Sequence, residues 1–104
     1  MARKLNREQI LKEAWIGDAV LTLYARSRIL REDGIADNAK AERMTSNRFL
    51  SAISDPSEAE AAIGRVYQSQ GLDAAFRWIE DRLMPVFDRQ EGKRQRREGI
   101  IRCD

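Results

Sequence analysis

The chain has 104 residues, of which 42% are apolar and 35% charged, a balance that predicts one folded domain rather than a membrane or disordered chain. The absence of histidine excludes Ser-His-Asp and Cys-His nucleophilic systems and every histidine-bearing metal site. A single cysteine, Cys103, excludes an intrachain disulfide and a cysteine zinc cluster. Carboxylates remain as the candidate catalytic or metal-binding groups, and their oxygens suit magnesium or manganese.

The formal net charge of +2 is unevenly distributed. Residues 89–104 hold six basic and three acidic residues, whereas residues 1–88 hold 13 basic and 14 acidic residues. The excess positive charge therefore lies at the C-terminal end. The first residues lack the apolar stretch of a signal peptide, and no apolar run approaches the ~20 residues needed to span a bilayer. We therefore expect a cytoplasmic location, with neither a membrane nor a disulfide partner.

The first half of the chain predicts two helices. Asn6 is a good N-cap, and Gln9 follows it at the spacing of a capping box. Apolar residues then recur at three- and four-residue steps as far as Gly34, which is a typical residue to follow a helix. A second helix is expected after Asp37, with its inward-facing residues extending to Ile53.

The second half predicts two more helices. Asp55 precedes a proline at the first helical position, and this is the clearest helix start in the chain. The third helix is expected over residues 56–70, closed by Gly71, and the fourth over residues 72–83. Pro85 is expected to kink or end it.

These elements predict an all-α fold, a compact bundle of about four helices in a domain of residues 1–89. Residues 90–104 are expected to form a basic, flexible C-terminal tail. Closely spaced cations can bind nucleic-acid phosphates, although a solvated charged end is at least as plausible. The candidate phosphate-binding residues of this tail are Lys93, Arg94, Arg96 and Arg97.

Two acids, Asp18 and Glu60, lie on the apolar faces of their predicted helices. A carboxylate there needs a cation or hydrogen-bond donors. Gly17 and Gly64 stand nearby, and glycine on a helix face lets two backbones approach closely. Two helices that meet there would bring both carboxylates together, and a divalent cation would relieve their repulsion. The alternative is that each acid pairs with an arginine and that the glycines only serve packing.

Three segments carry a resemblance to a known family. Residues 14–26, A-W-I-G-D-A-V-L-T-L-Y-A-R, resemble the signature helix of the ribonuclease III family, E-R-L-E-F-L-G-D-A-V-L. Residues 60–75, E-A-A-I-G-R-V-Y-Q-S-Q-G-L-D-A-A, resemble its second motif, D-T-F-E-A-L-I-G-A-I-Y-L-D-Q-G-L-E-A-A. Between them, T-S-N-R-F-L at residues 45–50 is similar to the family's S-N-x-x-L segment. The resemblance covers roughly residues 8–87, in the correct order.

The resemblance implies a homodimeric, all-α endonuclease that cuts double-stranded RNA with Mg²⁺, for which Mn²⁺ can substitute. It implies that Asp18 and Glu60 hold the metal and are catalytic, because they fall on the family's G-D aspartate and D-T-F-E glutamate. It also implies that Trp15 lies at the dimer interface, the alternative being an ordinary core tryptophan. Arg43, Arg48 and Arg65 lie near the motifs and are weaker candidates for contact with RNA phosphates.

The chain also departs from the family. Leu11, Ala14 and Ser57 stand where the family usually has Glu, Glu and Asp. The Mini-ribonuclease III branch, which lacks a double-stranded-RNA-binding domain, shares the alanine, and this chain resembles that branch most. The family usually has several tens of residues between the S-N segment and the second motif, whereas here Ile53 is followed almost at once by Asp55 and Pro56. The resemblance therefore implies a minimal version of the fold. The rival interpretations are a catalytically silent module that binds RNA or a ribonucleoprotein, and a plain helical interaction dimer.

Overall fold

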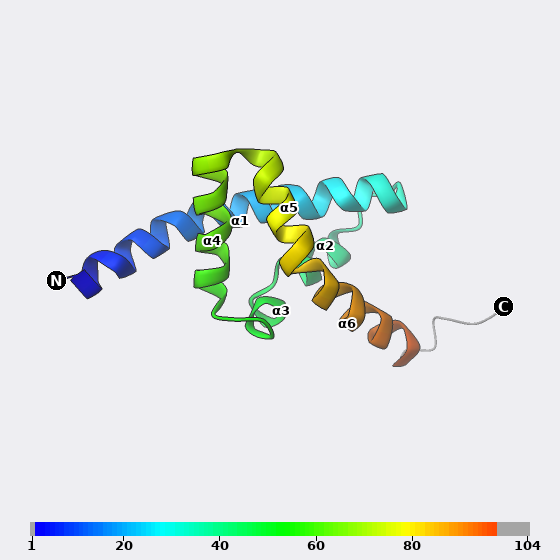
Figure 1. The fold of residues 1–104 in the computed structure, drawn as a ribbon. Coiled ribbons are helices and arrows are strands. Elements are labelled where there is room, and N and C mark those ends of the chain that lie inside the picture. The colour runs from blue at the N-terminus through cyan, green and yellow to red at the C-terminus, as the bar shows by residue number, and fades with distance from the viewer. Residues whose placement is uncertain (1, 98–104) are drawn as a thin grey trace.

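The chain folds entirely from helices joined by short turns (Figure 1). The computed structural model describes the backbone of residues 2–97 and the side chains of residues 7–97. No strand occurs within residues 2–97, which confirms the all-α prediction. The helices of this part of the chain are α1 (Ala2–Asp33), α2 (Asn38–Thr45), α3 (Asn47–Ser51), α4 (Pro56–Gln70), α5 (Leu72–Arg82) and α6 (Met84–Arg97).

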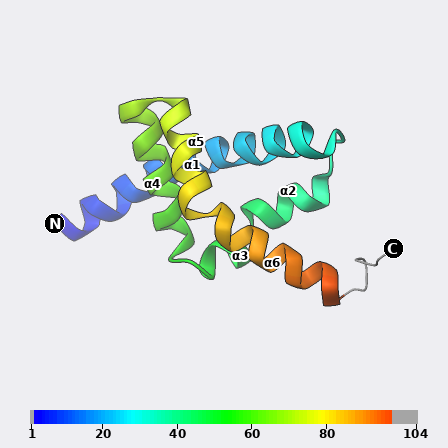
Figure 2. The ribbon, with the colours of Figure 1, turned by 45° about the vertical axis from the view of Figure 1, so that its right-hand side comes forward.

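The long helix α1 is the element around which the others are arranged. Figure 1 shows α4 crossing α1 steeply and α5 crossing it next to α4, while α6 leads away from the end of α5. Figure 2 shows α6 passing beside α2 and α3. Apolar side chains from all six described helices meet in one core, because burial of apolar surface stabilises the assembly. The largest fully buried side chains are Leu21, Met44, Leu50, Ile63, Ile79 and Leu83.

Local signals in the sequence set several helix ends as predicted. The Asp55 side chain accepts a hydrogen bond of 3.1 Å from the backbone N–H of Glu58, so Asp55 caps α4. Gly34 and Gly71 adopt φ values of 75° and 96° after α1 and α4. Those left-handed conformations strain any residue with a Cβ, and glycine adopts them freely.

The predicted second helix is divided into α2 and α3. Ser46 separates them with an extended backbone, and its Oγ accepts a 3.0 Å hydrogen bond from the backbone N–H of Phe49. A serine that caps a new helix competes with continuation of the old one. The prediction of one helix across this region was therefore wrong, although its apolar residues Met44, Phe49 and Leu50 are buried as expected.

Helix α6 continues past Arg89, the expected end of the domain, as far as Arg97. Helix α5 ends at Arg82, close to the predicted end at residue 83. Pro85 lies in the first turn of the next helix, α6, where its missing N–H breaks no helical hydrogen bond. Phe87 is buried, and Asp88 accepts a 2.9 Å hydrogen bond from Arg28, which ties α6 to α1. The helix count of about four is thereby corrected to six within residues 2–97.

The remaining part of the predicted tail, residues 98–104 with Cys103, lies outside the described residues. None of the helices that the structure describes combines the length and the apolar character that crossing a bilayer requires.

Candidate metal centre

Helices α1 and α4 are in backbone contact where Gly17 meets Gly64. A Cβ placed on Gly17 would collide with the carbonyl group of Glu60, and one placed on Gly64 would collide with that of Glu13. Each such Cβ would also lie 3.0 Å from the backbone nitrogen of the other glycine. The close approach predicted from the two glycines is thus present, and both positions require a residue without a side chain.

Asp18 and Glu60 face each other beside this crossing. Asp18 follows Gly17 on α1 and is exposed, whereas Glu60 lies one turn before Gly64 on α4 and is half-buried. Burial, the negative charge of Asp18 and a hydrogen bond between the two carboxyl groups raise the pKa of Glu60 to about 7. Two ionised carboxylates this close repel each other, so one proton or one cation is favoured between them.

The exposure of Asp18 differs from its predicted place on the inward apolar face. Asp18 occupies the rim of the α1–α4 contact, because the glycine beside it takes the buried position on that face. The carboxylate pair is consequently reached from solvent at Asp18, while Glu60 is more enclosed.

No arginine or lysine within residues 7–97 forms an ion pair with Asp18 or Glu60. The cation nearest in the sequence, Arg65, instead binds Glu13 across the helix crossing, with its Nη2 3.0 Å from the carboxylate. A hydrogen bond from Gln9 and the contacts with Arg65 lower the pKa of Glu13. The alternative that Asp18 and Glu60 each pair with an arginine is therefore not supported, because neither acid has a cationic partner in the described part of the chain.

The two carboxylates suit a magnesium ion as a partial ligand set. Mg²⁺ is commonly bound through one or two carboxylates, with water and substrate phosphate oxygens completing its six ligands. Within residues 7–97 no group of three or more Asp, Glu, His or Cys side chains is placed to hold a metal. Ala14 is buried and Ser57 half-buried at the positions where the sequence lacks two further acids, so the pair would rely on water and substrate.

Trp15 projects from α1 into solvent and is 80% exposed. The core-tryptophan alternative is therefore excluded. Leu11 lies one turn before Trp15 and Leu23 two turns after it, and both are 47% exposed. Residues at this spacing share one side of a helix, so α1 presents an apolar strip beside the carboxylate pair.

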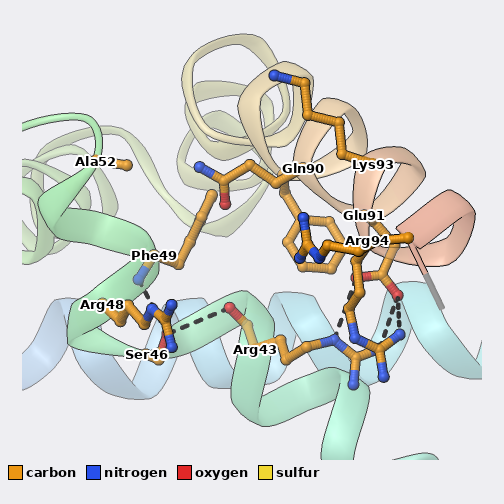
Figure 3. A pocket seen from close by; sticks show the side chains of 11 residues that line it. Arg43, Ser46, Arg48, Phe49, Ala52, Gln90, Glu91, Lys93 and Arg94 are labelled. Carbon is orange, nitrogen blue, oxygen red and sulfur yellow. Dashed lines mark hydrogen bonds and ion pairs between the residues drawn. The ribbon is translucent and has the colours of Figure 1, made fainter.

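The basic candidates separate into three groups. Arg65 forms an ion pair with Glu13. Arg96 lies on α6 but does not line the cleft formed by the remaining candidates. The others line a cleft between α2–α3 and α6, shown in Figure 3, although at least 45 positions separate the α2–α3 residues from those of α6 in the sequence. These residues are Arg43, Arg48, Lys93, Arg94 and Arg97.

Sequence reasoning missed two acids that organise these surfaces. Glu13 binds Arg65, and Glu91 accepts two hydrogen bonds from Arg43, at 3.1 Å from Nε and 2.7 Å from Nη2. Neither acid departs from the ordinary polar pattern of a solvated helix face, so the sequence contains no signal that separates them from other surface acids. Their partners lie 52 and 48 residues away, and only the fold brings them together.

Comparisons with protein-family models, with curated proteins and with solved structures find no match to this chain.

Proposed function

We propose that this protein is a magnesium-dependent endoribonuclease of the ribonuclease III type that hydrolyses phosphodiester bonds in double-stranded RNA. The observation that carries the proposal is the contact between Asp18 and Glu60, which lack a cationic partner among the described residues. Two facing carboxylates without a cation form an unfavourable arrangement in the absence of a ligand. A binding role explains why a chain with many arginines leaves this pair uncompensated.

The proposed roles follow from position and exposure. Asp18 and Glu60 would hold one ion, and Mn²⁺ would be able to replace Mg²⁺ because both prefer oxygen ligands. When bound, the ion would lower the pKa of a coordinated water and offset charge on the scissile phosphate. Asp18, which is exposed, would meet the substrate first, and the more enclosed Glu60 would hold the ion together with it. The glycine contact brings the two helices that carry these carboxylates close together.

We further propose that the protein is a homodimer formed through the apolar strip of α1. An 80% exposed tryptophan flanked by two half-exposed leucines supports this, since such a strip is unfavourable in water and suits a partner surface. The strip lies on the helix that carries Asp18, so a two-fold dimer would place two carboxylate pairs on neighbouring parts of one assembly.

Cleavage of long double-stranded RNA, with and without Mg²⁺, tests the proposed reaction. We expect cleavage only with Mg²⁺ or Mn²⁺, and its loss in Asp18→Asn and in Glu60→Gln. Asp81→Asn is the matched control, because Asp81 is an exposed helical aspartate on α5 and its substitution removes the same charge. Cleavage by Asp18→Asn at the wild-type rate would refute the catalytic assignment.

The catalytically silent module is the second candidate, because the ligand set contains only two side chains and the basic cleft lies on other helices. It predicts binding of double-stranded RNA without cleavage under any divalent cation. The plain interaction dimer predicts neither binding nor cleavage. The same assay, with a binding measurement added, separates the three.

A further inference from the structure

A cleft of about 520 Å³ lies between α2–α3 and α6, away from the residues that form the carboxylate pair. Five basic side chains line it, and Figure 3 shows four of them, Arg43 and Arg48 on one wall and Lys93 and Arg94 on the other. Arg43 and Arg48 come from the α2–α3 wall, and Lys93, Arg94 and Arg97 come from α6. The fold therefore concentrates in one place cations that the sequence distributes over two distant segments.

One acid fixes the two walls relative to each other. Glu91 binds Arg43 through two hydrogen bonds and also lies 3.7 Å from Nη1 of Arg94. Below the cleft, the rings of Phe49 and Phe87 pack edge to face, 5.6 Å apart, and hold α3 against α6. A floor of packed rings and a bidentate arginine contact make the cleft a preorganised surface rather than a set of independent side chains.

The net charge of the cleft is opposite in sign to the net charge of the other residues within 7–97. With five cations, and with Glu91 as the one acid among its described lining residues, the cleft carries a net charge of +4. Residues 7–97 hold 16 basic and 15 acidic residues in all, so the rest of this part of the chain carries −3. Arg48, Lys93 and Arg97 are exposed, so the cleft presents concentrated positive charge to solvent. Such a concentration of charge favours an anion with several charges over a single small ion.

The floor of the cleft indicates which part of a nucleic acid would contact it. Phe49 and Phe87 are only 4% and 3% exposed, so neither ring can stack on a base. Arginine and lysine, by contrast, bind phosphate through charge-assisted hydrogen bonds without reading a base. The cleft therefore suits the backbone of a nucleic acid and recognition that is independent of sequence.

We propose that this cleft is a second binding site, which holds backbone phosphates of double-stranded RNA while the carboxylate pair acts elsewhere on the same molecule. The choice of RNA as the polyanion rests on the proposed function, whereas the phosphate-binding chemistry rests on the cleft alone. The cleft supplies affinity, and Asp18 and Glu60 supply the chemistry.

The test compares two triple variants of the full chain. The cleft variant is Arg48→Gln/Lys93→Gln/Arg97→Gln, and the control variant is Arg77→Gln/Arg89→Gln/Arg96→Gln. Each removes three exposed cations, two of them from α6, so net charge and helix content change equally. The residues of the control variant do not line the cleft. Circular dichroism and a urea titration verify that both variants are folded.

Binding of a short RNA duplex is measured by fluorescence anisotropy across a salt titration, with EDTA present so that cleavage cannot occur. We expect the cleft variant to bind on the order of tenfold more weakly or worse at low salt, with a salt slope flatter by ~0.9 for each phosphate that it no longer neutralises. The control variant should retain most of the wild-type affinity. Equally weakened binding in the two variants, or unchanged binding in both, would overturn the proposal.

Two further readouts identify the cause of a failure. If wild type and the cleft variant bind RNA as expected but neither cuts it with Mg²⁺, the cleft proposal stands and the proposed nuclease function fails. If wild-type protein cuts RNA while the cleft variant binds it as well as wild type does, the cleft proposal fails alone. Vesicles containing phosphatidylserine complete the test. If wild type binds these vesicles and the cleft variant does not, while the two bind RNA equally well, the cleft binds a membrane surface and the RNA proposal is overturned.

Discussion

Gly17 and Gly64 lie against each other so closely that a Cβ on either would meet the backbone of the opposite helix. The contact is between backbones, so no side-chain rearrangement could accommodate an added methyl group. Asp18 follows the first glycine directly and Glu60 lies one turn before the second. The glycine contact therefore sets the separation of the two carboxylates.

Gly64→Ala should destabilise the protein by about 1–3 kcal/mol or more, the range for overpacking, because α1 and α4 must move apart. The same movement should separate Asp18 from Glu60 and weaken Mg²⁺-dependent cleavage in the protein that remains folded. Urea unfolding and the cleavage assay measure the two effects. Gly92→Ala is the control, since its Cβ would meet only Nη1 of Arg96, at 3.7 Å. Replacing that helical glycine should stabilise the protein by up to ~1 kcal/mol.

The Asp18–Glu60 contact predicts a pH dependence of stability. The pKa of Glu60 is about 7 in the folded protein against an ordinary value of 4.5, so the folded state holds more protons between these values. The free energy of unfolding contributed by Glu60 should therefore fall as pH rises from about 4.5 to 7 and remain lower above it. Because the pair is partly exposed, we expect a decrease on the order of 1–2 kcal/mol.

Glu60→Gln isolates this effect, because its side chain is neutral at every pH. Relative to wild type, the variant should gain stability between pH 5 and pH 8, whereas the titration of other acids affects both proteins alike. Addition of Mg²⁺ at pH 8 should stabilise wild type and leave the variant unchanged, since the ion binds the ionised pair of the folded state. If the difference in free energy of unfolding between wild type and the variant did not change with pH, the pKa of Glu60 would not be raised in the folded protein.

Trp15→Ala should dissociate the proposed dimer while leaving the single subunit almost as stable. Trp15 is 80% exposed, so its removal creates no cavity within one subunit. A tryptophan central to an interface commonly accounts for ~2 kcal/mol or more of binding, roughly a thirtyfold change in the dissociation constant. Sedimentation at several concentrations measures this change. Ile35→Ala, at a 62% exposed position between α1 and α2, should have no effect. A monomeric wild-type protein at micromolar concentration would contradict the homodimer.

Tyr24→Phe should lower the free energy of unfolding by about 0.5–1.5 kcal/mol, the usual net contribution of one hydrogen bond. The buried Tyr24 hydroxyl donates a 2.8 Å hydrogen bond to Glu80 and so links α1 to α5. Its ring packs edge to face on Phe76 at 5.2 Å, an arrangement that phenylalanine preserves. Urea unfolding should show the decrease. Tyr67→Phe, at a position that is 40% exposed, should be nearly neutral, and an equal decrease there would refute the assignment.

The sequence alone determined the features that depend only on residues close together in the chain, such as helix ends. The caps at Asp55, Gly34 and Gly71 act within one turn of the backbone, so their effect can be recognised without knowing the fold. The proximity of Asp18 and Glu60 was also predictable, because each acid lies near a glycine and glycine marks a helix face that can make close contact. The failure at Ser46 has a local cause too, since a serine within an apolar pattern can cap a new helix as well as continue the old one.

Only the tertiary structure decided how the charged residues are used. The pairing of Arg65 with Glu13 and the joining of Arg43 to α6 through Glu91 connect residues about 50 positions apart. The exposure of Trp15 and the continuation of α6 beyond Arg89 likewise depend on what packs against each helix. A solvated charge satisfies the helical pattern equally well on any exposed face, so sequence periodicity cannot select its partner. The distance between charges in space selects it, because electrostatic attraction falls with separation and the fold alone sets that separation.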